Sequence, residues 1–112
     1  DTVVCHSLAN TLWFWLCQEE MLTVERLFMV SPPSLNTTES TIKTFFPYPQ
    51  PKNIHAKEVH IIVSDDDPWV QLEEAKDMAS YYNASFTTIQ KGGHINAESG
   101  YGKWSFIEGL VL

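Results

Sequence analysis

Three side chains in this sequence of 112 residues have the functional groups of a nucleophile, an orienting acid and a base: Ser7, Asp67 and His94. A serine hydroxyl is a weak nucleophile near neutral pH and needs a base to take its proton. The base in turn needs a carboxylate that holds its tautomer and stabilises its charged form. These types, in the order Ser, Asp, His, predict chemistry at an acyl carbon with Ser7 as the attacking group.

Each of the three has a simpler explanation when taken alone. Ser7 could cap the N-terminus of a helix, and His94 could be a surface residue after a Gly-Gly turn. The acidic run 65–67 could be a solvated cluster or a helix cap. The three together, each following a predicted strand, are a much rarer coincidence, so we favour the joint interpretation. We choose Asp67 because it directly precedes Pro68, where the chain turns away, and Asp66 is the alternative.

The five residues around Ser7 have the layout of a nucleophile elbow, a sharp turn from a strand into a helix. Such a turn needs small residues two positions to either side, and Cys5 and Ala9 stand where glycines are usual. Both are small enough for the turn to form. The backbone N–H of Leu8 would then face the oxyanion of a tetrahedral intermediate. His6 is expected to point to the opposite side of the turn and to have a structural role.

Hydrophobic patterns predict a regular alternation of strands and helices. The helix nearest Ser7 is apolar on more than one face, which predicts burial on both sides. The alternation indicates an α/β fold with a parallel sheet and helices on both faces, where ligands bind beyond the carboxyl ends of the strands. The predicted strands are residues 2–5, 26–30, 58–63 and 85–89, and the predicted helices are residues 7–20, 72–82 and 102–112.

Residues 32–57 contain five of the six prolines and the aromatic group 45–48. A loop of this length either covers a site, with its aromatics as an apolar wall, or lies on the surface with its aromatics tucked beneath it. Trp69, just after Asp67, has the same two interpretations: it lines an acyl pocket or it is a buried anchor.

Charge and composition argue against several classes of partner. Fourteen acidic residues against seven basic ones give a net charge of −7, and no basic cluster exists to follow a nucleic acid backbone. No apolar run approaches the ~20 residues that cross a bilayer.

Neither His55 nor His60 has a cysteine or carboxylate at ligand spacing, so we expect no metal and no other cofactor. Two cysteines are too few for a disulfide framework and favour a cytoplasmic location. Residues 1–112 are expected to form a single domain.

Three segments resemble the small serine hydrolases related to retinoblastoma-binding protein nine. The resemblance spans nearly the whole chain. It implies a compact α/β-hydrolase with no large lid domain, the catalytic triad Ser7, Asp67 and His94, and esterase-like or broader hydrolase activity on a small-molecule acyl substrate. The segments are Val4-Cys5-His6-Ser7-Leu8-Ala9, Val63-Ser64-Asp65-Asp66-Asp67-Pro68-Trp69 and Lys91-Gly92-Gly93-His94-Ile95-Asn96.

The sequence begins at Asp1 directly with a strand pattern. In the resembled family, earlier strands and a loop that supplies a second oxyanion donor would precede this point. We therefore expect the C-terminal portion of a small α/β-hydrolase, with the N-terminal strands absent, acting beside an N-terminal fragment or by self-association. The same triad would also serve an acyltransferase, and a catalytically silent interaction protein on a hydrolase scaffold is the alternative function.

Overall fold

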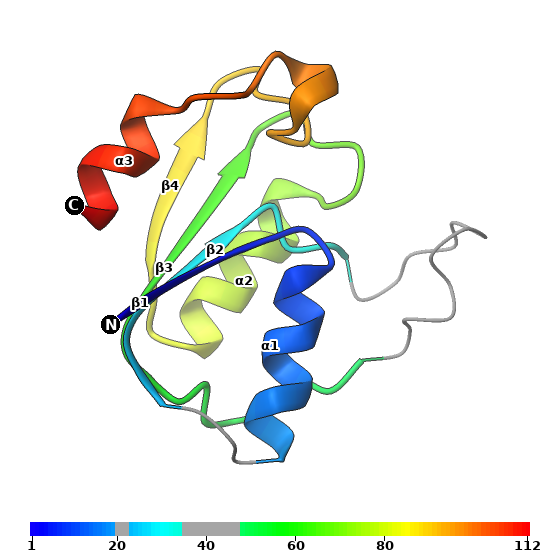
Figure 1. Cartoon of the computed structure of the whole chain (residues 1–112). Coiled ribbons are helices and arrows are strands. Elements are labelled where there is room, and N and C mark those ends of the chain that lie inside the picture. The colour runs from blue at the N-terminus through cyan, green and yellow to red at the C-terminus, as the bar shows by residue number, and fades with distance from the viewer. Residues whose placement is uncertain (20–22, 35–47) are drawn as a thin grey trace.

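Strands and helices alternate along the chain in the computed structural model, which describes residues 1–19, 23–34 and 48–112 (Figure 1). The strands are β1 (Thr2–His6), β2 (Val24–Val30), β3 (Ala56–Ser64) and β4 (Ser85–Ile89). The helices are α1 (Ala9–Gln18), α2 (Leu72–Tyr81) and α3 (Ser105–Val111), and a short 3₁₀ helix spans Ala97–Ser99. Every element that the hydrophobic patterns predicted is present. The 3₁₀ helix was not predicted, because three residues are too few to show a period.

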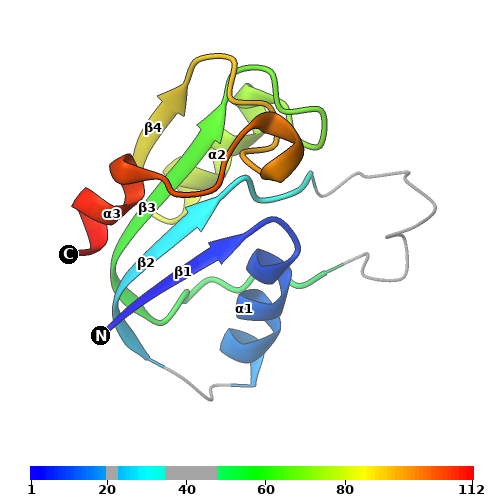
Figure 2. The ribbon, with the colours of Figure 1, turned by 45° about the horizontal axis from the view of Figure 1, so that its top comes forward.

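The four strands form one parallel sheet in the order β1-β2-β3-β4. Figure 2 shows them side by side with their arrowheads pointing the same way. The register pairs His6 with Val30, Val30 with Ile62, and Ser64 with Ile89, so the strands end close to the same line. The loops that follow β1, β3 and β4 therefore meet at one edge of the sheet, where parallel sheets place their ligands.

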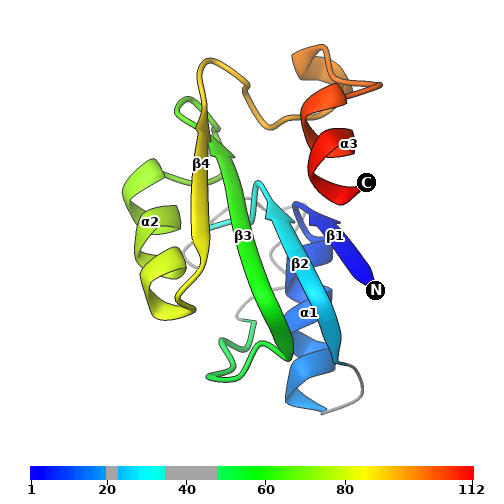
Figure 3. The same ribbon diagram turned by 90° about the vertical axis from the view of Figure 1, so that its left-hand side faces the viewer.

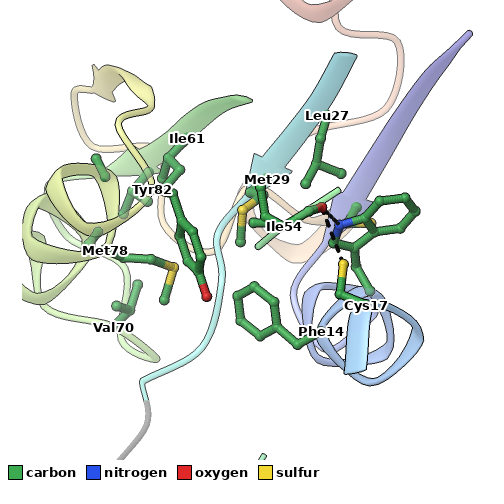
Figure 4. Packing of buried hydrophobic residues seen from close by; sticks show 14 of the residues in the cluster. Phe14, Cys17, Leu27, Met29, Ile54, Ile61, Val70, Met78 and Tyr82 are labelled. Atoms are coloured by element: carbon green, nitrogen blue, oxygen red, sulfur yellow. Dashed lines mark hydrogen bonds between the residues drawn. The ribbon is translucent and has the colours of Figure 1, made fainter. Parts of the chain in front are cut away.

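Helices cover both faces of the sheet, as expected. The helices α1 and α2 pack against one face, and α3 lies on the other side of the sheet from α2 (Figure 3). On the first face, Phe14 of α1 and Met78 of α2 meet Met29 and Ile61 of the central strands (Figure 4). On the second face, Ile107 and other apolar residues of α3 pack against a smaller cluster, which is Phe28, Val30, Ile62 and Ile95.

Helix α1 differs from its expected burial. Trp13 and Phe14 are buried, but Leu12 and Trp15 are 59% and 48% exposed. The prediction of burial on both sides was therefore wrong for this helix, because an apolar side chain does not by itself specify a packing partner. The buried side is held by two hydrogen bonds to the carbonyl of Ile54, from Trp13 Nε1 at 2.9 Å and from the Cys17 thiol at 3.2 Å.

Tyr48 is the one member of the predicted aromatic group that the structure describes, since residues 45–47 lie outside the described part of the chain. Its ring stacks on Phe14 at 5.6 Å between centroids, and its hydroxyl donates to the carbonyl of Pro33 at 2.8 Å. Tyr48 therefore belongs to the core on the α1 face and not to the wall of a site.

Across the described residues, none of the helices has the length and apolar character that crossing a membrane requires.

Candidate active site

Ser7 lies in the tight turn between β1 and α1, with its backbone in the left-handed region at a φ of 55°. A residue other than glycine costs roughly 1–3 kcal/mol in such a sparsely populated region, so the turn must be held from outside. The N–H of Ser7 donates to the carbonyl of Val30 at 3.0 Å, and the N–H of Asn10 donates to the carbonyl of Ser7 at 3.0 Å. The expected elbow is thus present with Cys5 and Ala9 in place of glycines.

Asn10 ties this turn to the neighbouring strand. Its fully buried side-chain amide donates to the carbonyl of Ser7 at 2.9 Å and to that of Val30 at 3.1 Å. Asn10 was not among the residues predicted from the sequence. The available signal was a polar amide in the first turn of an otherwise apolar helix, since a buried amide must find partners.

Asp67 and His94 meet Ser7 at the carboxyl edge of the sheet. Both carboxylate oxygens of Asp67 lie 3.1 Å from His94 Nδ1, and His94 Nε2 lies 2.7 Å from Ser7 Oγ. The Asp67 side chain is 0% exposed and that of His94 is 11% exposed. Asp67 Oδ1 also accepts from the N–H of Trp69 at 2.9 Å, which fixes the carboxylate from a second direction.

The direction of these hydrogen bonds follows from the donors available. An ionised carboxylate only accepts, so Nδ1 of His94 carries the hydrogen. In a neutral imidazole Nε2 is then the acceptor, and the hydroxyl of Ser7 donates to it. The arrangement is one in which His94 can take the Ser7 proton while Asp67 holds the ring.

The three consecutive aspartates have three different partners in the loop that carries His94. Asp67 alone among them contacts the imidazole. Asp66, the alternative, accepts from the N–H of Gly93 at 2.8 Å and from the Ser64 hydroxyl at 3.2 Å. Asp65 accepts from the N–H of Lys91 at 2.8 Å. The acidic run is therefore a set of anchors for the loop, whereas the sequence suggested a solvated cluster, a helix cap or competing candidates for the role of the acid.

His94 uses all four of its polar groups. Besides the two ring contacts, its N–H donates to Ser99 Oγ at 3.2 Å, and its carbonyl lies 2.8 Å from His6 Nε2. The expectation that His6 points away from the nucleophile did not foresee this contact. Gly93, at a φ of 58°, is required just before His94, since a Cβ there would stand 2.6 Å from Ser99 Oγ.

An aromatic side chain and an apolar groove lie next to Ser7, Asp67 and His94. The ring of Trp69 is tilted against that of His94 at 6.0 Å between centroids, so Trp69 lies beside the base. A groove of about 340 Å³ lies between the end of β1 and the 101–108 segment, with His6, Val30, Ile95 and Trp104 among its walls. This groove is open and largely apolar, and Ser7 is not one of its lining residues.

The described residues contain no group of three His, Cys, Asp or Glu side chains able to hold a metal ion. His60, weighed as a ligand from the sequence, instead has its Nε2 2.7 Å from the hydroxyl of Thr87. Its partial burial against Phe28 lowers the pKa of its imidazole by desolvation.

The comparisons with known proteins agree on the fold. With TM-scores of 0.80, the chain is similar to a YdeN-like hydrolase from Pectobacterium atrosepticum at 18% identity and to the YdeN gene product from Bacillus subtilis at 21%. Each match covers 98% of this chain, but only 56% and 62% of the other chains, respectively. An esterase domain from Rhodothermus marinus is similar at a TM-score of 0.57 and 13% identity, over 98% of this chain and 58% of that one.

A search of curated proteins found no match. The family model described as serine hydrolase, however, matches residues 1–111, which is nearly the whole sequence. The chain belongs to the serine hydrolase family.

Proposed function

We propose that the protein hydrolyses ester, thioester or amide bonds through an acyl intermediate on Ser7. The observation that carries this proposal is the 2.7 Å approach of Ser7 Oγ to His94 Nε2, with Asp67 behind the ring. The family match and the resemblance to hydrolases related to retinoblastoma-binding protein nine support the same chemistry.

In the acylation step, Ser7 Oγ bonds to the carbonyl carbon of the substrate while its proton moves to His94 Nε2. The carbonyl electron pair moves onto oxygen to give a tetrahedral oxyanion. The intermediate collapses when the bond to the leaving group breaks, and the leaving alcohol, thiol or amine takes the proton from Nε2. Asp67 stabilises the imidazolium that exists between these events, and its carboxylate stays ionised throughout.

In the deacylation step, water takes the place of the leaving group. His94 Nε2 accepts a proton from the water as its oxygen bonds to the acyl carbon, and the second tetrahedral intermediate releases the acid. The proton then returns from Nε2 to Ser7 Oγ, which restores the starting state. An alcohol or amine that replaces water in this step would make the protein an acyltransferase.

The oxyanion needs hydrogen-bond donors aimed at its developing charge. Leu8 follows the nucleophile and forms the N-cap of α1, so we assign its backbone N–H as one donor. The positive end of the α1 dipole lies at the same place and favours the negative charge further. Removing a single oxyanion donor costs about 10²–10³ in rate in a protease where it was measured, so this one contact matters.

Labelling with a fluorophosphonate probe tests the proposal directly, because the probe reacts with an activated serine. The expected result is one adduct per molecule, mapped by peptide mass spectrometry to Ser7, and its loss in Ser7→Ala. Asp67→Asn should label far more slowly, since its side-chain amide can donate to Nδ1 of His94 and favour the wrong tautomer. The equivalent change in a protease lowers kcat about 10⁴-fold.

Asp77→Asn, an exposed aspartate of α2, is the matched control and should label like the unmodified protein. A folded protein that gives no Ser7 adduct, with Ser7→Ala retaining every other property, would support the silent interaction protein instead. For a labelled protein, release of free acid from a short acyl ester distinguishes hydrolysis from transfer to an added alcohol.

A further inference from the structure

His6, the residue before the nucleophile, is linked to the backbone of the base. Its Nε2 lies 2.8 Å from the carbonyl oxygen of His94, a contact between residues 88 positions apart in the sequence. The two imidazole rings also meet, with centroids 5.1 Å apart and planes inclined by 52°. The strand that presents Ser7 therefore holds His94 by a route separate from the Ser7 hydroxyl.

The contact has only one possible direction. A carbonyl oxygen can only accept, so Nε2 of His6 must carry a hydrogen and donate it. A neutral His6 is then the Nε2–H tautomer, the opposite of the Nδ1–H tautomer that Asp67 imposes on His94.

The backbone around His94 explains why such a bond is needed. Gly93 and Ile95, on either side of it, have φ angles of 58° and 52°. A positive φ at a β-branched residue is a strained conformation that the surroundings must hold in place. The peptide that joins His94 to Ile95 contains the carbonyl that His6 binds, so the hydrogen bond lies directly on the strained link.

We propose that His6 is a positioning residue for His94: its Nε2–H fixes the His94 carbonyl, and through it the direction from which the imidazole meets Ser7. This inference rests on the proposed function, in which His94 moves the proton. His6 itself contacts neither the Ser7 hydroxyl nor the His94 ring nitrogens in the hydrogen bonds of the site.

The test compares two replacements of His6. His6→Phe keeps a flat ring but has no donor, and His6→Gln keeps an N–H that can reach the carbonyl. We expect His6→Phe to lower kcat and the rate of fluorophosphonate labelling 10-fold or more with little change in KM, and His6→Gln to restore most of both. His60→Phe, which removes a half-buried histidine on the α3 face, is the matched control and should keep the original kcat.

A spectroscopic readout separates positioning from simple destabilisation. In the unmodified protein, ring ¹⁵N signals should report Nδ1–H for His94 and Nε2–H for neutral His6, and in His6→Phe the His94 signals should shift toward a mixture of tautomers. If His6→Phe does not fold, His6→Asn replaces it in the test. Its amide is too short to reach the His94 carbonyl, so His6→Asn should lower kcat 10-fold or more.

Two results would overturn the inference in a protein that labels at Ser7: equal labelling rates for His6→Phe and the unmodified protein, or equal losses in His6→Phe and His6→Gln. Failure of the unmodified protein to label at Ser7 is a different outcome, because it contradicts the proposed function itself and removes the basis of this inference with it.

Discussion

Asp66 accepts a hydrogen bond from the backbone N–H of Gly93 at 2.8 Å, one residue before the pair in which Asp67 meets His94. The loop after β3 and the loop after β4 are thus joined at three successive aspartates, because Asp65 likewise accepts from the backbone N–H of Lys91 at 2.8 Å. The Ser64 hydroxyl adds a further link, because it contacts both Asp66 and the carbonyl of Gly93. The position of the base is therefore set by the neighbouring strand and not by its own loop alone.

Asp66→Asn should lower kcat about 10-fold while leaving the Ser7, Asp67 and His94 side chains in place. The change weakens a charge-assisted bond to Gly93, and small misplacements of a catalytic group are costly, since about 1 Å can cost 10² in rate. Steady-state kinetics with an ester substrate measure the effect. Asp77→Asn on α2 removes the same charge far from the site, and an equal loss in that variant would show that Asp66 acts only through net charge.

The sheet, and the meeting of Ser7, Asp67 and His94 at one end of it, could be predicted because their signals are local. A β-branched run such as residues 58–63 indicates a buried parallel strand, and polar groups at the ends of such strands come together in any parallel sheet. The choice of Asp67 over Asp66 also had a local basis, in Pro68. The fold class that these patterns predicted is the one observed.

The roles of Asp66, Asn10 and His6 could not be predicted, since each depends on a partner distant in sequence. Asn10 binds the carbonyl of Val30, and His6 binds that of His94. Backbone carbonyls are the same in every residue, so the amino-acid sequence does not indicate which carbonyl a side chain will bind. The exposed side of α1 was missed for the related reason that apolar composition does not specify what covers a face.

The two cysteine thiols should resist alkylation in the folded protein. Burial raises the pKa of Cys5 to about 11, and burial together with the nearby Cys5 raises the pKa of Cys17 to about 11. At pH 8 only about one thiol in 10³ is then the reactive thiolate. Iodoacetamide at pH 8, followed by mass spectrometry, should modify neither cysteine until denaturant is added.

Ser80→Cys provides the positive control, because position 80 is exposed on α2 and its thiol should react at once. Modification of Cys5 at the same rate as this introduced thiol would contradict the buried environment two residues before Ser7, and with it the packing of the elbow.

His60 should make stability fall with acid. Desolvation lowers the pKa of its imidazole in the folded protein below the value of about 6.5 expected in the unfolded chain. Between these two pKa values the unfolded state binds more protons, so the free energy of unfolding rises with pH there. The contribution is complete above pH 6.5 and is lost as the pH falls toward the folded value. Urea unfolding should show that the free energy of unfolding falls more between pH 7.5 and pH 5 for the unmodified protein than for His60→Gln. Equal decreases in the two proteins would exclude His60 as the cause.

Gly93→Ala should destabilise the protein by about 1–3 kcal/mol and reduce kcat, because Gly93 has a φ of 58° and an added Cβ would lie 2.6 Å from Ser99 Oγ. Ser99 cannot easily move aside, since its hydroxyl donates to Asn96 Oδ1 at 2.8 Å and accepts from the N–H of His94. Urea unfolding gives the stability change and ester hydrolysis gives kcat.

Gly109→Ala in α3 is the matched control. Apart from the backbone of its own helix and its two chain neighbours, no atom lies within 4 Å of the added Cβ, and alanine favours a helix over glycine by about 0.5–1 kcal/mol. The double variant Gly93→Ala/Ser99→Ala, compared with Ser99→Ala alone, removes the collision but keeps the backbone strain. If Gly93→Ala were as stable as Gly109→Ala, the conformation described here for Gly93, in the turn that presents His94 to Ser7, would be contradicted.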